Sequence, residues 1–77
     1  TGPAKNQFER AALSIVLNLA EGSAKPSQKQ RKQFYSISLG SFKEVRAIMQ
    51  LYSKQTETIT KTADILGAHL YKLWKNT

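Results

Sequence analysis

The side chains that could perform acid–base or metal chemistry are few and scattered along the sequence. His69 is the single histidine, and cysteine is absent. A structural zinc site takes about four cysteine or histidine ligands, which this chain lacks. No glycine-rich phosphate loop is present, and the carboxylates lie on separate helical turns without forming an evident pair: Glu9, Glu21, Glu44, Glu57 and Asp64. The sequence therefore predicts a non-catalytic protein without a metal, another cofactor or a small-molecule substrate.

The basic residues are the more numerous chemical feature. Twelve Lys and Arg against five Asp and Glu give a formal net charge of +7 over 77 residues. Such an excess attracts polyanions, and phosphate contacts of this kind supply most non-specific affinity for RNA or DNA. An acidic protein partner or a merely soluble basic surface accounts for the charge equally well. The candidate phosphate contacts are Lys25, Lys29, Arg31, Lys32, Lys43, Arg46, Lys61, Lys72 and Lys75.

The elements that position these residues are helices. Apolar spacing predicts an all-α single domain over residues 1–77, with helices at about 4–21, 28–53 and 57–75, and no stretch alternates as a strand does. Pro3 suits a first helical turn, Gly22 suits the left-handed residue after a helix, and Ser27 suits a cap. Gly40, inside the second helix, indicates either close approach of a neighbouring backbone or a kink that splits the helix.

Each predicted helix has an apolar stripe, and the first has two on nearly opposite faces. A helix that is apolar on two sides predicts contact between subunits, and a chain this short buries only about 60% of its unfolded surface, which also favours oligomerisation. The stripes are Phe8, Ala12, Ile15 and Leu19, then Leu13, Leu17 and Ala20, in the first helix; Phe34, Ile37, Ser41, Val45, Ile48 and Tyr52 in the second; and Ile59, Ala63, Leu66, Leu70 and Leu73 in the third.

One polar strip, formed by Arg10, Ser14, Asn18 and Glu21, crosses the first helix. It is either a buried network that sets the register between helices or an ordinary solvated strip. Glu21 lies in the last helical turn, where the macrodipole disfavours a negative charge, so we expect a cation from another helix or chain beside it. An enzymatic role requires several chains to bring this strip around one cavity.

Aromatic side chains lie near several of the lysines. Phe34 belongs to a core stripe and favours packing, whereas Tyr35, Tyr71 and Trp74 lie at stripe margins, where a subunit interface or a nucleic acid can use them. A helix-turn-helix protein is disfavoured, because the second predicted helix is far longer than a recognition helix. Sequence-specific groove reading is therefore not expected.

The sequence also bears on location. No run approaches the about 18 apolar residues of a membrane span, and the N-terminus lacks a secretory pattern. Together with the absence of cysteine, these features predict a cytoplasmic protein without a membrane partner. The chain begins Thr1-Gly2-Pro3 without an initiator methionine, which is consistent with a fragment or a processed form.

Two segments resemble a known family. Residues 10–23 read RAALSIVLNLAEGS, which is similar to a signature in which Arg-Ala-Ala-x-Ser-Ile runs into Asn-Ile-Ala-Glu-Gly. Residues 39–44 read LGSFKE, similar to Leu-Gly-Ser-x-x-Glu in the following helix. Both signatures are those of bacterial four-helix-bundle proteins encoded in 23S ribosomal RNA intervening sequences. The third helix matches this family in pattern more than in letters.

The resemblance implies an antiparallel up-and-down four-helix bundle, of which this chain contains three helices and lacks the family's first. Either the chain is truncated or processed, or another chain fills the fourth position. The resemblance also implies homo-oligomeric rings, typically pentamers. It further implies kinship with the accessory proteins of diversity-generating retroelements, which are basic and associate with nucleic acid and a reverse transcriptase.

Overall fold

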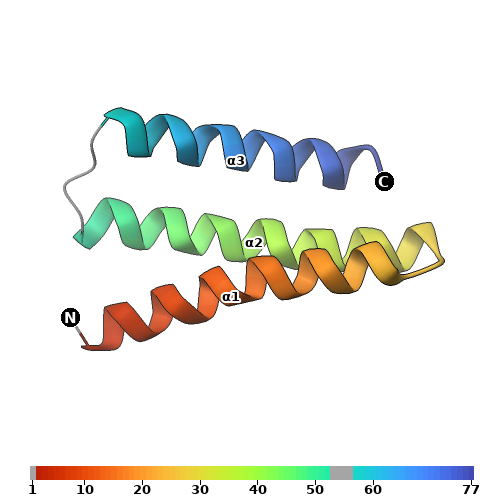
Figure 1. Ribbon diagram of the computed structural model, residues 1–77, viewed down its shortest axis with the longest axis horizontal. Helices are drawn as coiled ribbons and strands as arrows, with labels where there is room; N and C mark the ends of the chain where they lie inside the picture. Colours follow the sequence, from red (N-terminus) through yellow and green to blue (C-terminus); the bar gives the residue numbers. More distant parts are fainter. Residues whose placement is uncertain (1, 53–56) are drawn as a thin grey trace.

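The chain folds into helices only, over the residues that its computed structural model describes, 2–52 and 57–77. These helices are α1 (Gly2–Ala24), α2 (Gln28–Tyr52) and α3 (Glu57–Lys75) (Figure 1). The all-α prediction is confirmed. α1 begins two residues earlier than predicted and ends three residues later, and residue 53, the predicted end of the second helix, lies outside the described residues.

The break between α1 and α2 is shorter than predicted. α1 continues through Gly22 to Ala24, and no glycine in the described ranges has a positive φ, so the left-handed role predicted for Gly22 was wrong. Ser27 caps α2, because its hydroxyl oxygen accepts a hydrogen bond from the backbone N–H of Gln30 at 3.3 Å. This prediction is confirmed. Pro3 lies in the first turn of α1, also as predicted.

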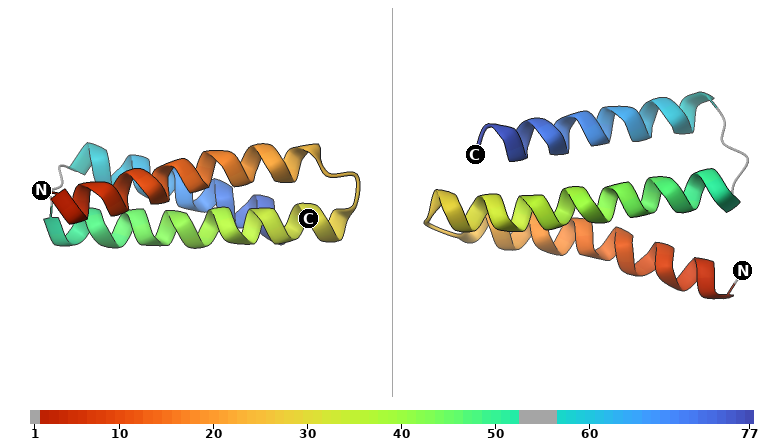
Figure 2. Two further views of the ribbon diagram at one scale, coloured as in Figure 1. Left: turned by 90° about the horizontal axis from the view of Figure 1, so that it is seen from below. Right: turned by 180° about the vertical axis from the view of Figure 1, so that it is seen from behind.

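The three helices run up, down and up as a shallow open layer with α2 in the middle (Figures 1 and 2). The Cα trace measures 40 × 25 × 13 Å along its principal axes. Among the described residues, α1 and α3 each pack along α2, and their backbones do not come together. α2 therefore has to bury two sides, whereas each outer helix packs its backbone against one neighbour.

The core takes side chains from all three helices. It consists of Ala11 and Ile15 from α1, Phe42 and Val45 from α2, and Leu70 from α3. The stripe predicted for α2 was only partly right: Val45 is buried, but Ile37 is 51% exposed. The side chains of Tyr52 and Ile59 lie outside the described part.

The buried face of α2 is rotated relative to the predicted stripe. Tyr35, Ser38 and Phe42 are buried on α2, and none of them belongs to that stripe. The reason is that α2 packs against α3 as well as α1, so its most buried residues face the angle between the two neighbours. A single apolar stripe accounts for only one of these two helix contacts.

Glycine permits close approach at both interfaces of α2. A Cβ at Gly22 would lie 2.7 Å from Cε1 of Tyr35, and a Cβ at Gly67 would lie 2.6 Å from Cε2 of Phe42. Both distances are shorter than real Cβ contacts, so each glycine makes room for a buried ring. At Gly40 no heavy atom beyond the adjoining residues and the local helix backbone lies within 4 Å of the corresponding Cβ position, and α2 continues unbroken. Neither predicted explanation of Gly40 is found within the described part of the chain.

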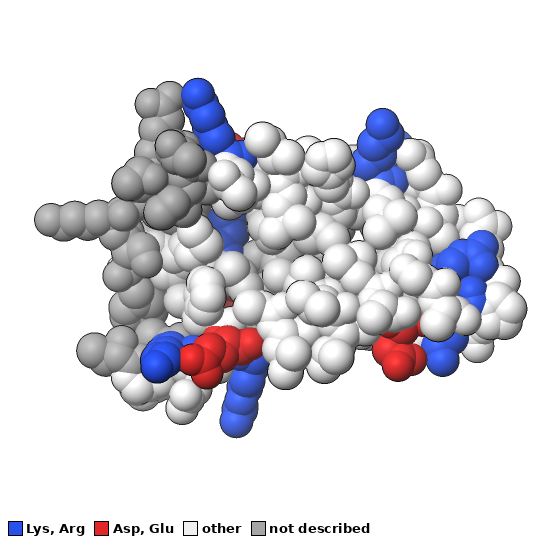
Figure 3. Space-filling view, viewed as in Figure 1, with Lys and Arg blue, Asp and Glu red and all other residues white. Residues whose placement is uncertain are grey.

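The second apolar face of α1 is exposed. Leu13, Val16 and Leu17 are 57%, 62% and 53% exposed, whereas Ile15 is buried. This confirms that α1 is apolar on two sides. In α3, Leu70 is buried while Leu66 and Leu73 remain 41% and 39% exposed. Figure 3 shows a face over these helices on which Lys and Arg project mainly from the margins and the centre is largely uncharged.

No helix in the described part of the chain is both long enough and apolar enough to cross a membrane.

Candidate functional site

The predicted basic residues nearest the break lie at the end of the molecule where α1 turns into α2 and α3 ends (Figure 1). Arg31 holds this turn together. Its Nη1 donates hydrogen bonds to the backbone carbonyls of Lys25, at 3.1 Å, and Pro26, at 2.9 Å. The half-buried Arg31 side chain is therefore committed to local structure, although its charge still adds to the field.

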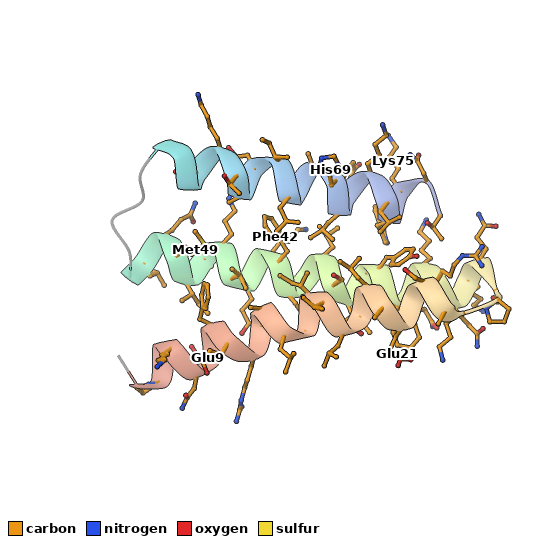
Figure 4. All side chains as sticks on the ribbon, viewed as in Figure 1. Glu9, Glu21, Phe42, Met49, His69 and Lys75 are labelled. Atoms are coloured by element: carbon orange, nitrogen blue, oxygen red, sulfur yellow. The ribbon has the colours of Figure 1, made fainter. Side chains whose placement is uncertain are left out.

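Three lysines at this end lie against aromatic rings. Nζ of Lys32 on α2 lies 4.8 Å from the ring centroid of Trp74 on α3. Nζ of Lys25 lies 5.3 Å from the ring centroid of Phe34. Lys75, labelled in Figure 4, lies with its Nζ 6.0 Å from the ring centroid of Tyr71. Exposed cation–π contacts of this kind each contribute about 0.5–1 kcal/mol.

The tyrosine and the tryptophan on α3 also contact each other. The rings of Tyr71 and Trp74 have centroids 5.8 Å apart with an interplanar angle of 43°. Tyr71 is 50% exposed, and Trp74 is half-buried. The sequence placed both rings at a stripe margin without relating them to a particular lysine. No sequence signal connects Lys32 with Trp74, because the contact depends on how α3 packs on α2.

Two open hollows adjoin along α2, and Trp74 of α3 lines one of them. One, of about 290 Å³, is lined by Lys29, Lys32, Gln33, Ser36 and Trp74. The other, of about 470 Å³, is lined by Gln33, Phe34, Ser36 and Ile37. They share Gln33 and Ser36. We call the surface formed by Lys25, Lys29, Lys32, Gln33, Phe34, Ser36 and Trp74 the basic–aromatic end.

The remaining predicted basic residues are spread over the helices. Arg46 forms an ion pair with Asp64, with Nη2 and Oδ1 2.7 Å apart, and so connects α2 to α3. Both side chains are about half exposed, which limits such a pair to about 0–1 kcal/mol. Lys43 and Lys72 are exposed and, like Lys29, form no ion pair with a described residue. Lys61 is exposed on α3.

The polar strip of α1 divides into an inner and an outer part. Asn18 donates hydrogen bonds from Nδ2 to the backbone oxygen of Ser14 at 2.8 Å and to its Oγ at 3.0 Å, and Ser41 on α2 donates to the same Oγ at 2.7 Å. Ser14 and Asn18 are half-buried at the α1–α2 interface, whereas Arg10 and Glu21 are exposed.

The ion-pair partner of Glu21 is local. Lys25 lies one helical turn later with its Nζ 3.5 Å from Oε2 of Glu21. Within this chain the cation comes from the next turn and not from another helix, so that part of the expectation was wrong, whereas a cation from another chain stays a prediction. The spacing of four residues is itself a sequence signal for such a pair, and sequence reasoning missed it. Glu9 and Glu21 are labelled along α1 in Figure 4.

The side chains that could bind a metal ion lie apart in the part of the chain that the structure describes. In the described ranges, no group of three or more His, Cys, Asp and Glu side chains is placed to hold a metal ion. His69 lines a separate open hollow on α3 with Lys72, Leu73, Asn76 and Thr77.

The two segments that carry the family resemblance meet in the structure. Ser14 of the first segment and Ser41 of the second share the 2.7 Å hydrogen bond across the α1–α2 interface. A family model described as 23S rRNA-intervening sequence protein matches residues 3–75. The chain belongs to this family. The resemblance seen in the sequence is thereby confirmed.

Membership of the 23S rRNA-intervening sequence protein family covers all three helices, since the match runs from the first turn of α1 to the last residue of α3. The family's description names no activity. No curated protein and no solved structure matches the chain.

Proposed function

We propose that this chain is a non-catalytic subunit of a homo-oligomeric helical scaffold that associates with RNA or DNA without reading base sequence. The observation that carries the proposal is the basic–aromatic end, where Lys25, Lys29 and Lys32 lie beside the half-buried rings of Phe34 and Trp74. Phosphate contacts by such lysines release counterions and do not depend on sequence.

The distribution of ion pairs supports this proposal. Glu9 pairs with Lys5, Glu21 with Lys25, and Asp64 with Arg46. Most carboxylates in the described part are therefore already beside a cation, while Lys29 and Lys43 have no such partner there. Among the described residues, the exposed side chains of Lys29 and Lys43 therefore remain available to phosphates.

Assembly is the second part of the proposal. We infer that a fourth helix from outside these 77 residues completes an up-and-down bundle, and that the subunits form a ring, typically a pentamer, in the cytoplasm. The open layer and the exposed side chains of Leu13, Val16 and Leu17 support assembly, because exposed apolar surface of this kind is costly unless another helix covers it. Repetition in a ring multiplies the basic field.

Titration of the intact protein with structured RNA and with duplex DNA, at about 50 mM and about 200 mM salt, tests nucleic-acid binding. We expect micromolar binding to both polymers that weakens steeply as salt rises, with similar affinities for unrelated sequences. Absence of salt-sensitive binding would rule the proposal out. Native mass spectrometry of the same sample reports the number of subunits.

A protein-interaction module is the alternative function, and the largely uncharged face in Figure 3 favours it. Such a module binds an acidic protein or only further copies of itself. If it is correct, the oligomer forms without nucleic acid and Leu17→Gln changes its assembly. Lys29→Gln then weakens binding of an acidic protein, or has no effect if the module binds only itself.

A further inference from the structure

We propose that the basic–aromatic end is a site for single-stranded nucleic acid, in which an unstacked base lies on the indole of Trp74 while Lys29 and Lys32 contact the adjoining phosphates. This inference rests on the proposed association with RNA or DNA. It adds that the ligand is single-stranded, and that Trp74 is the residue that favours a single strand over a duplex.

The arrangement of side chains carries the first step. Trp74 forms one wall of a hollow whose other walls include Lys29 and Lys32. An aromatic wall beside two ammonium groups presents a stacking surface next to phosphate-binding groups, which is the combination that single-strand binding surfaces use. A paired base in a duplex is already stacked on its neighbours and cannot lie flat on the indole.

Exchange of the Lys32 contact is the second step. In the free protein the Lys32 ammonium lies over the Trp74 ring at 4.8 Å, and its four-carbon stem is flexible. Stacking of a base on an aromatic ring is stronger than an exposed cation–π contact. A base therefore displaces the ammonium from the ring, and the ammonium remains close enough to pair with the phosphate of the same nucleotide.

The adjoining hollow extends the site. Gln33 and Ser36 line both hollows. Phe34 also lines the second one, and the ammonium of Lys25 lies over its ring. A nucleic-acid strand that crosses Gln33 and Ser36 thus runs from the Lys32–Trp74 pair to the Lys25–Phe34 pair. Packing holds both rings in place. The Cβ atom of Phe34 lies 3.0 Å from where a Cβ atom of Gly22 would be, and Trp74 is half-buried.

Trp74 is the single tryptophan, so its fluorescence reports on the site directly. The intact protein is titrated with oligo-U and oligo-dT, with a duplex of the same length, and with heparin and polyglutamate as polyanions without bases. We expect both single strands to quench Trp74 and to bind at least about fivefold more tightly than the duplex. Heparin is expected to bind without comparable quenching.

Two variants separate stacking from charge, with anisotropy of labelled strands as the readout. Trp74→Leu is expected to weaken single-strand binding about fivefold or more while duplex binding is unchanged, and Trp74→Phe is expected to retain most of the affinity. Lys29→Gln is compared with Lys43→Gln, which removes the same charge from an exposed position that lines neither hollow. We expect Lys29→Gln to weaken single-strand binding more than Lys43→Gln does.

Three results would overturn the inference. The first is salt-sensitive binding of duplex and single strand with equal affinity and without quenching of Trp74 fluorescence. This result removes the inference but leaves the proposed function intact. Quenching by polyglutamate equal to that by oligo-dT identifies an acidic protein as the ligand instead. No salt-sensitive binding of any polymer removes both. If Trp74→Leu lacks the helical circular dichroism of the wild type, it cannot test stacking. The inference is then tested by quenching of wild-type Trp74 fluorescence by single strands and by the comparison of Lys29→Gln with Lys43→Gln.

Discussion

The hydroxyl of Ser38 on α2 donates a hydrogen bond to the backbone carbonyl of Ile15 on α1, 3.0 Å away. Ser38 is completely buried, with 0% of its surface exposed. A buried hydroxyl is costly unless it finds a partner, and here its partner is the backbone of the neighbouring helix. This bond, the Ser14–Ser41 bond and the space at Gly22 together hold α1 close to α2.

Ser38→Ala is expected to lower the free energy of unfolding by about 1 kcal/mol, because it removes one hydrogen bond. Ser38→Leu is expected to cost more, about 1–3 kcal/mol further, since the interface has no space for a larger side chain. Urea unfolding followed by circular dichroism measures both. Ser36→Ala, at an exposed position on the same helix, is the matched control, and we expect it to change the free energy of unfolding little. Equal losses from Ser36→Ala and Ser38→Ala would contradict the prediction.

Gly22→Ala and Gly40→Ala are expected to change stability in opposite directions. Alanine favours a helix over glycine by about 1 kcal/mol, and at Gly40 nothing opposes this gain. At Gly22 the new methyl group meets the buried Tyr35 ring, so we expect a net loss of about 1–2 kcal/mol. Thermal unfolding of the two variants checks the signs. A loss at Gly40 would indicate that another chain approaches that position in the assembled protein.

Leu17→Gln is expected to change assembly without unfolding the subunit. Leu17 is 53% exposed on the outer face of α1 and lies outside the core cluster. The variant should keep its helical circular dichroism and shift toward smaller species in native mass spectrometry. Leu70→Ala is the contrasting change: it truncates a core residue and should cost about 2–5 kcal/mol. An unchanged subunit number in Leu17→Gln would show that this face takes no part in assembly.

Glu21→Gln is expected to change the free energy of unfolding by less than about 0.5 kcal/mol. The exposed ion pair with Lys25 is worth little, and removing a negative charge near the end of α1 offsets part of its loss. Urea unfolding at low and high salt measures the change. A loss of several kcal/mol, or a smaller subunit number than the wild type in native mass spectrometry, would show that another chain also contacts Glu21.

Several local features were predicted correctly, although the role of Gly22 was not. The all-α class, the Ser27 cap and the two-sided apolar character of α1 follow from residues within one or two turns of each other. The family could also be inferred, because its two motifs lie in continuous segments. The Glu21–Lys25 pair was equally local, and its four-residue spacing could have been used to predict it.

The contacts that form the candidate site were not predicted, because they join residues that are distant along the chain. Lys32 contacts Trp74, and Gly67 makes room for Phe42, only because α3 packs on α2 at one particular rotation. Residue spacing shows that a helix has an apolar side but not how two neighbours share it.

By itself, the sequence determined the helices, their approximate ends, the excess of positive charge and the family, since capping, helical periodicity and charge depend on residue type and local spacing. Only the tertiary structure decided which side of α2 is buried and which lysines lie against aromatic rings. The physical reason is that side-chain packing between helices selects one rotation of each helix from several that the same apolar pattern allows.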